Sequence, residues 1–402
     1  MDHWIKEDKS NERHEIEVLK VGDTKPLWER DGAFLAATIA YFVAALLFVF
    51  LRTASGLGWF GLLADRIGNQ ATDIVANVLI QIFIFFLVPL IIFQIYARKQ
   101  PLRKTLSDIG FRRPSRKVFG YSFLLGLLFY FFNIFVASIS FLVLMVLGFR
   151  FPTAGGEVAL VGTSGLLLGI LMIGVLPGFC EEVSTRGILL RGFMSKLSVW
   201  RAILLSSLIF GFMHLNIMQA FFAAVLGAFI AIAILVTKNI WTGIIIHFMN
   251  NAMGVLLSYA NANDWIIAQL YNQLFDLFLG PSGVIIYFVF VGVVYFSIMH
   301  ILHMFARDTY KADEKQHFAM FLKNNPERVR AMINAGQTVS AEEMSRSVDA
   351  YVQGLGKMRA IRFYLEGQHK PQKLKPLEIT LAFGLVFLTG AITIMTLVWG
   401  LL

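Results

Sequence analysis

The feature that most constrains this chain is a series of long apolar segments along its whole length. Most of them have about 18 to 25 residues, the length that an α-helix needs to cross the hydrocarbon core of a bilayer. Nine segments of this kind lie at residues 33–51, 75–97, 118–148, 158–185, 202–218, 220–237, 241–258, 283–305 and 377–401. The expected fold class is therefore all-α, a polytopic transmembrane helical bundle of about nine spans.

Composition excludes the main alternative classes. Charged residues make up 15% of the chain and hydrophobic residues 57%, whereas soluble domains carry about 25% charged residues. A soluble globular domain and a disordered chain are both excluded by these values. The single cysteine, Cys180, excludes a disulfide scaffold and any Cys-x-x-Cys metal site.

The positions of the basic residues predict the orientation of the chain in the membrane. If the N-terminus is cytoplasmic, the inner segments hold 32 Lys and Arg residues and the outer segments hold 3. Cytoplasmic loops of membrane proteins carry such an excess, so we expect the net charge of +9 to face anionic lipids rather than nucleic acid. The polar, mixed-charge beginning argues against a cleavable signal peptide. We expect a multi-pass protein of a bacterial inner membrane.

The polar stretches between the spans predict four parts. Two helix starts are expected in the third part, at Asn325-Pro326 and at the capping box Ser340-x-x-Glu343, whose helix should reach Met358. The four parts are a cytosolic N-terminal tail (1–32), a membrane domain (33–305), a small cytosolic helical insertion (306–376) and a C-terminal transmembrane helix (377–402).

Ionisable residues inside the apolar segments are concentrated in three short motifs. Such residues are costly in a membrane and are candidates for function. The motifs are Glu181-Glu182-x-x-x-Arg186, Phe210-x-x-x-His214 and His247-x-x-x-Asn251. Neutral amides in other spans, such as Asn77, Gln81 and Asn133, are interpreted as interhelical hydrogen-bonding groups instead.

Helical geometry separates the two carboxylates of the first motif. Glu182 and Arg186 are four residues apart, so they share a helix face and can form an ion pair. Glu181 points about 100° away from Glu182 and is left for another partner. Pro177, just upstream, should kink the helix and leave room for water beside Glu181.

The other two motifs supply complementary groups at the same spacing. His247 and Asn251 lie one helical turn apart and can donate hydrogen bonds toward one point, and Phe210 lies one turn below His214. A free carboxylate and an imidazole can hold and deprotonate a water molecule, and two convergent donors can stabilise an oxyanion. Together these groups indicate amide hydrolysis inside a membrane.

The three motifs, in this order and on separate spans, resemble the CPBP intramembrane protease family. That family includes the type II CAAX prenyl endopeptidases and the bacterial Abi and bacteriocin-processing proteins. The resemblance covers about residues 100–260. It implies that Glu181 and His214 activate the attacking water, that His247 and Asn251 form the oxyanion site, and that Glu182, Arg186 and Phe210 support this geometry.

The resemblance leaves the metal dependence open, because the family has been described both as metalloproteases and as metal-free glutamate proteases. Zinc accepts His and carboxylate ligands, and here these would be Glu181, His214 and His247. The chain has no His-Glu-x-x-His motif on one helix. We therefore favour metal-free hydrolysis without a cofactor.

The leading expectation is an intramembrane endopeptidase that cleaves a membrane-associated protein or peptide, either CAAX-type or leader-peptide-like. One alternative is a non-catalytic membrane scaffold or regulator with the same fold, for which the 306–376 insertion could be the docking site. Another is a transporter with an acidic-histidine proton relay, although no repeated halves of the sequence support it.

Overall fold

The computed structural model describes residues 32–97, 100–151, 162–279, 283–312, 318, 321–322, 324–337, 340–366 and 372–401. All regular secondary structure in these ranges is helical, which confirms the expected all-α fold. Residues 1–31 of the expected N-terminal tail and several stretches of the expected insertion lie outside the described residues.

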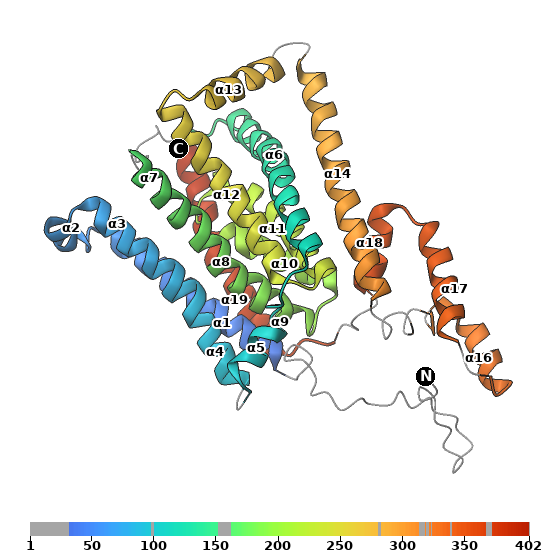
Figure 1. The fold of residues 1–402 in the computed structure, drawn as a ribbon. Helices are drawn as coiled ribbons and strands as arrows, with labels where there is room; N and C mark the ends of the chain where they lie inside the picture. Colours follow the sequence, from blue (N-terminus) through green and yellow to red (C-terminus); the bar gives the residue numbers. More distant parts are fainter. Residues whose placement is uncertain are drawn as a thin grey trace.

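The helices follow the apolar segments predicted from the sequence (Figure 1). Three stretches, labelled η, are π-helical. In chain order the elements are α1 (Ala33–Gly56), α2 (Gly61–Ile67), α3 (Asn69–Val78), η2 (Leu79–Leu87), α4 (Val88–Ala97), α5 (Leu102–Asp108), α6 (Arg116–Val146), α7 (Gly162–Gly169), η3 (Ile170–Val175), α8 (Leu176–Glu182), η4 (Val183–Leu190), α9 (Arg191–Met194), α10 (Val199–Phe212), α11 (Ile217–Thr237), α12 (Ile240–Ala262), α13 (Ile266–Leu279), α14 (Gly283–Lys311), α16 (Pro326–Asn334), α17 (Ala341–Gln353), α18 (Lys357–Glu366) and α19 (Pro376–Leu401).

Eight continuous helices in the described ranges are long and apolar enough to cross a bilayer. They are α1, the run from α3 to α4, α6, the run from α7 to α9, α11, α12, α14 and α19. Each corresponds to one of the predicted spans, and the chain is a multi-pass membrane protein.

The remaining predicted span, 202–218, is shorter than expected. Its helix, α10, has 14 residues and is therefore about 21 Å long at 1.5 Å per residue, less than the roughly 30 Å of a hydrocarbon core. The helix ends at Phe212 because the chain turns there: Leu215 has a left-handed φ of 50°, and the Asn216 side chain accepts a hydrogen bond from Met218 N and begins α11. The expectation that this helix reaches residue 218 is wrong.

Two threonines of α19 satisfy backbone groups on either side of this turn. Thr393 Oγ1 donates to the carbonyl of Phe212 at 3.1 Å, and the N–H of Ile217 donates to Thr396 Oγ1 at 3.0 Å. Irregular backbone at membrane depth is tolerated only where protein groups or water satisfy it. The C-terminal span therefore stabilises the α10–α11 turn.

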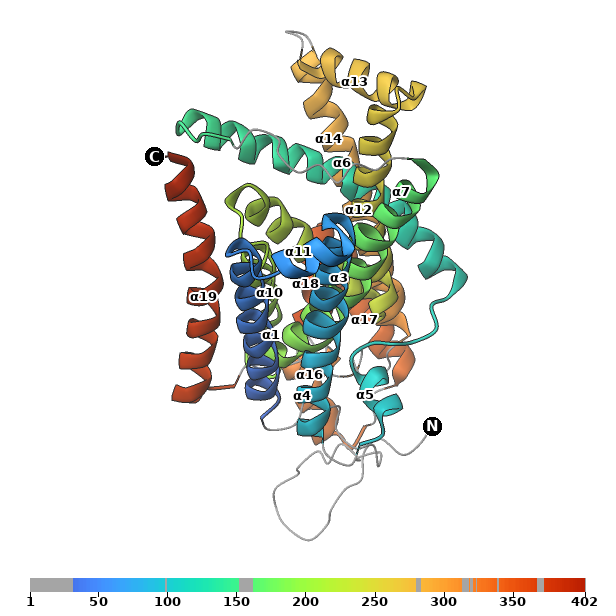
Figure 2. The same ribbon diagram turned by 90° about the vertical axis from the view of Figure 1, so that its left-hand side faces the viewer.

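The bundle has two distinct ends. Helix α5 and, from the Lys- and Arg-rich insertion, helices α16 and α17 lie at one end in both views, and α13 and the end of α19 lie at the other (Figures 1 and 2). Segments that the sequence places on the same side of a membrane thus lie together.

Two helix starts are predicted in the insertion. The structure confirms the one at Ser340 in full and the one at Asn325-Pro326 in part. Ser340 Oγ accepts from Glu343 N at 3.1 Å and caps α17, while α16 begins at Pro326 without a side-chain cap from Asn325. The expected continuation of the second helix to Met358 is wrong, because α17 ends at Gln353 and α18 is a separate helix.

We expect Gly211→Ala to destabilise the protein. A Cβ at Gly211 would lie 2.3 Å from the carbonyl oxygen of Ala220, so α10 and α11 would have to separate. Overpacking of this kind costs about 1–3 kcal/mol. Gly292→Ala in α14 is the control, because its Cβ would meet nothing within 4 Å. Thermal unfolding in detergent measures both, and equal midpoints for the two variants would contradict the close approach.

Candidate active site

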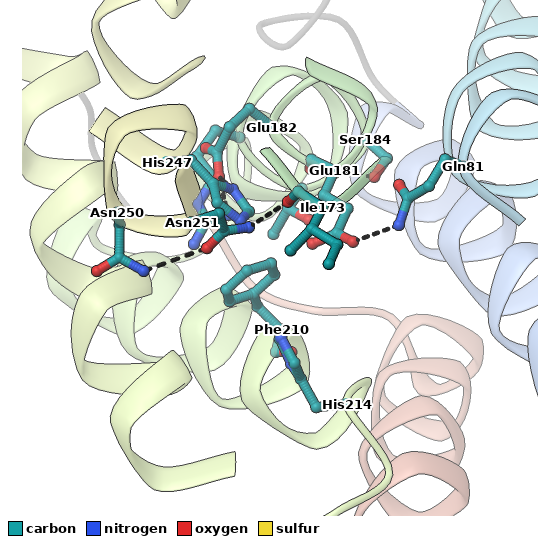
Figure 3. A network of polar contacts seen from close by, with 12 residues as sticks. Gln81, Ile173, Glu181, Glu182, Ser184, Phe210, His214, His247, Asn250 and Asn251 are labelled. Carbon is teal, nitrogen blue, oxygen red and sulfur yellow. Dashed lines mark hydrogen bonds and ion pairs between the residues drawn. The ribbon is translucent and has the colours of Figure 1, made fainter. Parts of the chain in front are cut away.

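The residues of the three motifs meet in one region of the bundle, although they come from α8, η4, α10 with the turn that follows it, and α12 (Figure 3). Phe210 lies between the two imidazoles. Its ring centroid is 5.2 Å from that of His214 and 5.8 Å from that of His247. The aromatic ring thus separates two histidines with different hydrogen-bond partners.

Glu182 is the centre of a buried charge cluster. Its Oε1 accepts from Arg186 Nη1 at 2.7 Å and from His247 Nδ1 at 2.9 Å, and the Glu182 and Arg186 side chains are 0% and 1% exposed. The guanidinium also lies 4.1 Å from the centre of the Phe210 ring, a cation–π arrangement. The predicted Glu182–Arg186 pair is confirmed, and it joins η4, α10 and α12 to α8.

A glycine makes room for this cluster. A Cβ at Gly227 of α11 would lie 2.6 Å from Arg186 Nη2. Only glycine lets α11 approach so closely, so the guanidinium is enclosed on that side too.

Glu181 points away from this cluster and toward a cavity of about 150 Å³. The Gln81 Nε2 donates to Glu181 Oε1 at 2.8 Å. A cavity of this volume has room for several water molecules, and its lining includes polar groups that can hold them. The residues that line it are Tyr41, Phe48, Ile80, Gln81, Phe85, Glu181, Phe210, Met213 and His214.

His214 follows the end of α10 and lines the same cavity as Glu181. Its Nδ1 lies 3.0 Å from the carbonyl oxygen of Phe210. A carbonyl oxygen can only accept, so Nδ1 carries the hydrogen, and in the neutral ring Nε2 holds the lone pair. This arrangement leaves His214 able to accept a proton through Nε2.

Asn251 lies on the other side of Glu181 from Gln81 (Figure 3) and is held by two hydrogen bonds. Its Nδ2 donates to the carbonyl of Ile173 at 2.9 Å, and its Oδ1 accepts from Asn250 at 3.2 Å. The Ile173 carbonyl cannot form the usual i+4 helical bond, because residue Pro177 has no N–H. The proline therefore creates the acceptor that Asn251 occupies.

Some of the predicted site residues line the cavity, and others do not. Glu181, His214 and Phe210 line the cavity, whereas His247 and Asn251 are not among its lining residues. One donor of each is already used, by Glu182 and by Ile173 respectively. The hydrogen bonds that the structure shows for His247 and Asn251 therefore go to two different acceptors, and not to the single point expected from the sequence.

The positions of the possible ligands bear on whether the site could hold a metal ion. Within the described residues, no group of three His, Cys, Asp or Glu side chains is placed to hold one. Of the three ligands considered from the sequence, His247 directs its Nδ1 to Glu182. No step of the proposed reaction is therefore assigned to a metal.

Gln81 was interpreted from the sequence as an interhelical hydrogen-bonding group without a chemical role. In the structure its amide contacts the carboxylate that the motifs mark as free. The sequence signal that could have identified Gln81 is the presence of an amide in an otherwise apolar stretch of the second span.

Comparison with known proteins gives one match, to a family model that covers part of the chain. Residues 163–253, which contain all three motifs, match the family model described as type II CAAX prenyl endopeptidase Rce1-like. No curated protein and no solved structure matches the chain. The match confirms the resemblance to CPBP and CAAX proteases, and it supports a CAAX-type intramembrane endopeptidase in general.

We expect Arg186→Met to destabilise the protein by about 3–5 kcal/mol, because it removes a cation from a buried carboxylate. Arg346→Met is the matched control: Arg346 pairs with Glu342 at the same spacing, but the two side chains are 77% and 84% exposed, and exposed pairs contribute little. Unfolding in detergent measures both variants. A small effect of Arg186→Met would show that Glu182 does not depend on it.

Proposed function

We propose that this chain, with its Rce1-like segment, hydrolyses a peptide bond at the cavity shared by Glu181 and His214. The observation that carries the proposal is this pairing, in which a carboxylate and an imidazole from different helices line one cavity inside a membrane bundle. The two groups can hold one water molecule between them and accept its proton.

The reaction follows from these groups. Glu181, as a carboxylate, takes one proton from the water, whose oxygen forms a bond to the peptide carbonyl carbon. The carbonyl oxygen becomes an oxyanion in the tetrahedral intermediate. The C–N bond then breaks, and the proton held by Glu181 passes to the leaving nitrogen, so that an amine and an acid are released. His214 Nε2 accepts a hydrogen bond from the water and orients it.

His247 and Asn251 are the proposed oxyanion donors. In its imidazolium form His247 keeps Nδ1 on Glu182 and presents its Nε2–H, and Asn251 retains a second Nδ2 hydrogen besides the one directed to Ile173. Donors held in place before the reaction stabilise an oxyanion without reorganisation. Both residues belong to α12, which packs against α8, the helix that carries Glu181, and this packing supports the assignment.

The proposed substrate is a membrane-associated protein or peptide, CAAX-type or leader-peptide-like. The family match supports this class, and the cavity walls contributed by Phe48, Ile80 and Phe85 suit a hydrophobic segment. We propose a cytoplasmic N-terminus, because the Lys and Arg residues are so unequally divided between the two sides. The proposed location is a bacterial inner membrane.

We expect Glu181→Gln and His214→Ala each to lower peptide cleavage by about 10²- to 10⁴-fold, the contribution of a positioned acid–base group. The assay uses the full chain in proteoliposomes with a farnesylated CAAX peptide and a hydrophobic leader peptide. His300→Ala is the control, because His300 is an exposed histidine of α14. Cleavage that persists in Glu181→Gln contradicts the proposal. If the wild type cleaves neither peptide and both variants retain the cellular phenotype of the wild type, the alternative of a non-catalytic membrane scaffold is favoured.

A second prediction concerns metal. Since Glu181, His214 and His247 do not form a metal-binding group in the structure, we expect cleavage by the purified protein to survive prolonged treatment with EDTA or 1,10-phenanthroline. Elemental analysis of the same active sample checks the result. Stoichiometric zinc that is lost together with activity, and restored with it, overturns the metal-free mechanism.

A further inference from the structure

Gln81 lies in η2, on a span that precedes the segment matched by the family model. Its side chain nevertheless reaches the centre of the site, where Nε2 donates to Glu181 Oε1 at 2.8 Å (Figure 3). The residue is 6% exposed. Within the described residues this is the one side-chain hydrogen bond to the Glu181 carboxylate.

The orientation of the amide follows from its partner. An ionised carboxylate only accepts hydrogen bonds, so the NH₂ group of Gln81 has to face it. The other end of the amide, Gln81 Oε1, is then buried, and it has no hydrogen-bond partner among the described protein atoms. A buried carbonyl oxygen without a partner is unfavourable. Gln94 and Asn133 also donate through their NH₂ groups and have a buried oxygen without a described partner, so the contact with the Glu181 carboxylate is what distinguishes Gln81.

The local backbone also favours a role at the site. In η2 the helix is wider than an α-helix, and the N–H of Val88 donates to the carbonyl of Phe83, five residues earlier. Such π-helical turns occur frequently at functional sites. Ile80 and Phe85 of the same segment line the cavity together with Gln81, so η2 forms one wall of it.

We propose that Gln81 is a positioning residue for Glu181. This inference rests on the function proposed above. By holding Oε1, the amide prevents the carboxylate from rotating and leaves Oε2 directed toward the water shared with His214. The segment that matches the family model thus supplies the base, and a helix outside that segment fixes its orientation.

The test compares Gln81→Met with Gln94→Met in the proteoliposome assay. Methionine has nearly the shape of glutamine but donates no hydrogen bond. Gln94 belongs to the same continuous helix and donates through Nε2 to the carbonyl of Gln100 at 2.6 Å, away from the cavity. We expect Gln81→Met to lower kcat by about 10- to 10²-fold, as a misplaced reacting group does, with little change in KM. Gln94→Met should leave both constants unchanged.

An infrared measurement reports the contact without depending on activity. The difference spectrum between the wild type and Glu181→Gln isolates the carboxylate stretch of Glu181. The same difference taken in the Gln81→Met background should show this band at a shifted frequency. An unshifted band overturns the proposal, because the hydrogen bond is then absent.

The kinetic outcomes separate this proposal from the proposed function. If Glu181→Gln abolishes cleavage while Gln81→Met keeps the wild-type kcat, the positioning role is wrong and the protease function stands. Equal losses in Gln81→Met and Gln94→Met also overturn it, because a general loss of packing then explains both. If the wild type cleaves neither peptide, the proposed function and this role fall together, whatever the position of the infrared band.

Discussion

The structure depends on the pairing of one buried carboxylate, that of Glu182, with a guanidinium and an imidazole. In an apolar bundle a carboxylate without a partner is strongly unfavourable. Arg186 and His247 both bind the same oxygen, and Phe210 covers the guanidinium. The helices that carry these side chains are thereby held at fixed positions. Glu181, one residue earlier, turns away from this cluster and contacts the cavity instead.

Two adjacent acidic residues thus have different environments for a geometric reason. The rotation of about 100° between neighbouring residues of a helix directs Glu182 to two basic groups and Glu181 to a cavity with a neutral amide and His214. Helices distant in sequence complete the cavity: Tyr41 of α1 lines it, and its hydroxyl lies 3.3 Å from Thr185 Oγ1. The family-matching segment alone does not enclose the site.

Hydropathy and helical spacing predicted the features that depend on local sequence. The long spans and the Glu182–Arg186 pair followed from segment length and i,i+4 spacing, and so did the separate direction of Glu181. The end of α10 could not be predicted, because its turn, residues 213–216, contains no Gly or Pro and Leu215 adopts a left-handed conformation there. The Gln81 contact joins residues 100 positions apart. It arises from the packing of two spans, which spacing along one helix does not reveal.

The two threonines on α19 have a consequence for the order in which the protein is made. The turn that carries His214 forms two hydrogen bonds with α19: Thr393 Oγ1 donates to the Phe212 carbonyl, which also accepts from Leu215 N, and Thr396 Oγ1 accepts from the N–H of Ile217. During translation the ribosome delivers α19 after the seven other described spans. A nascent chain in the translocon therefore lacks these two contacts with the His214 turn until α19 has been inserted, so the cavity that His214 lines is supported only after that helix packs against α10 and α11.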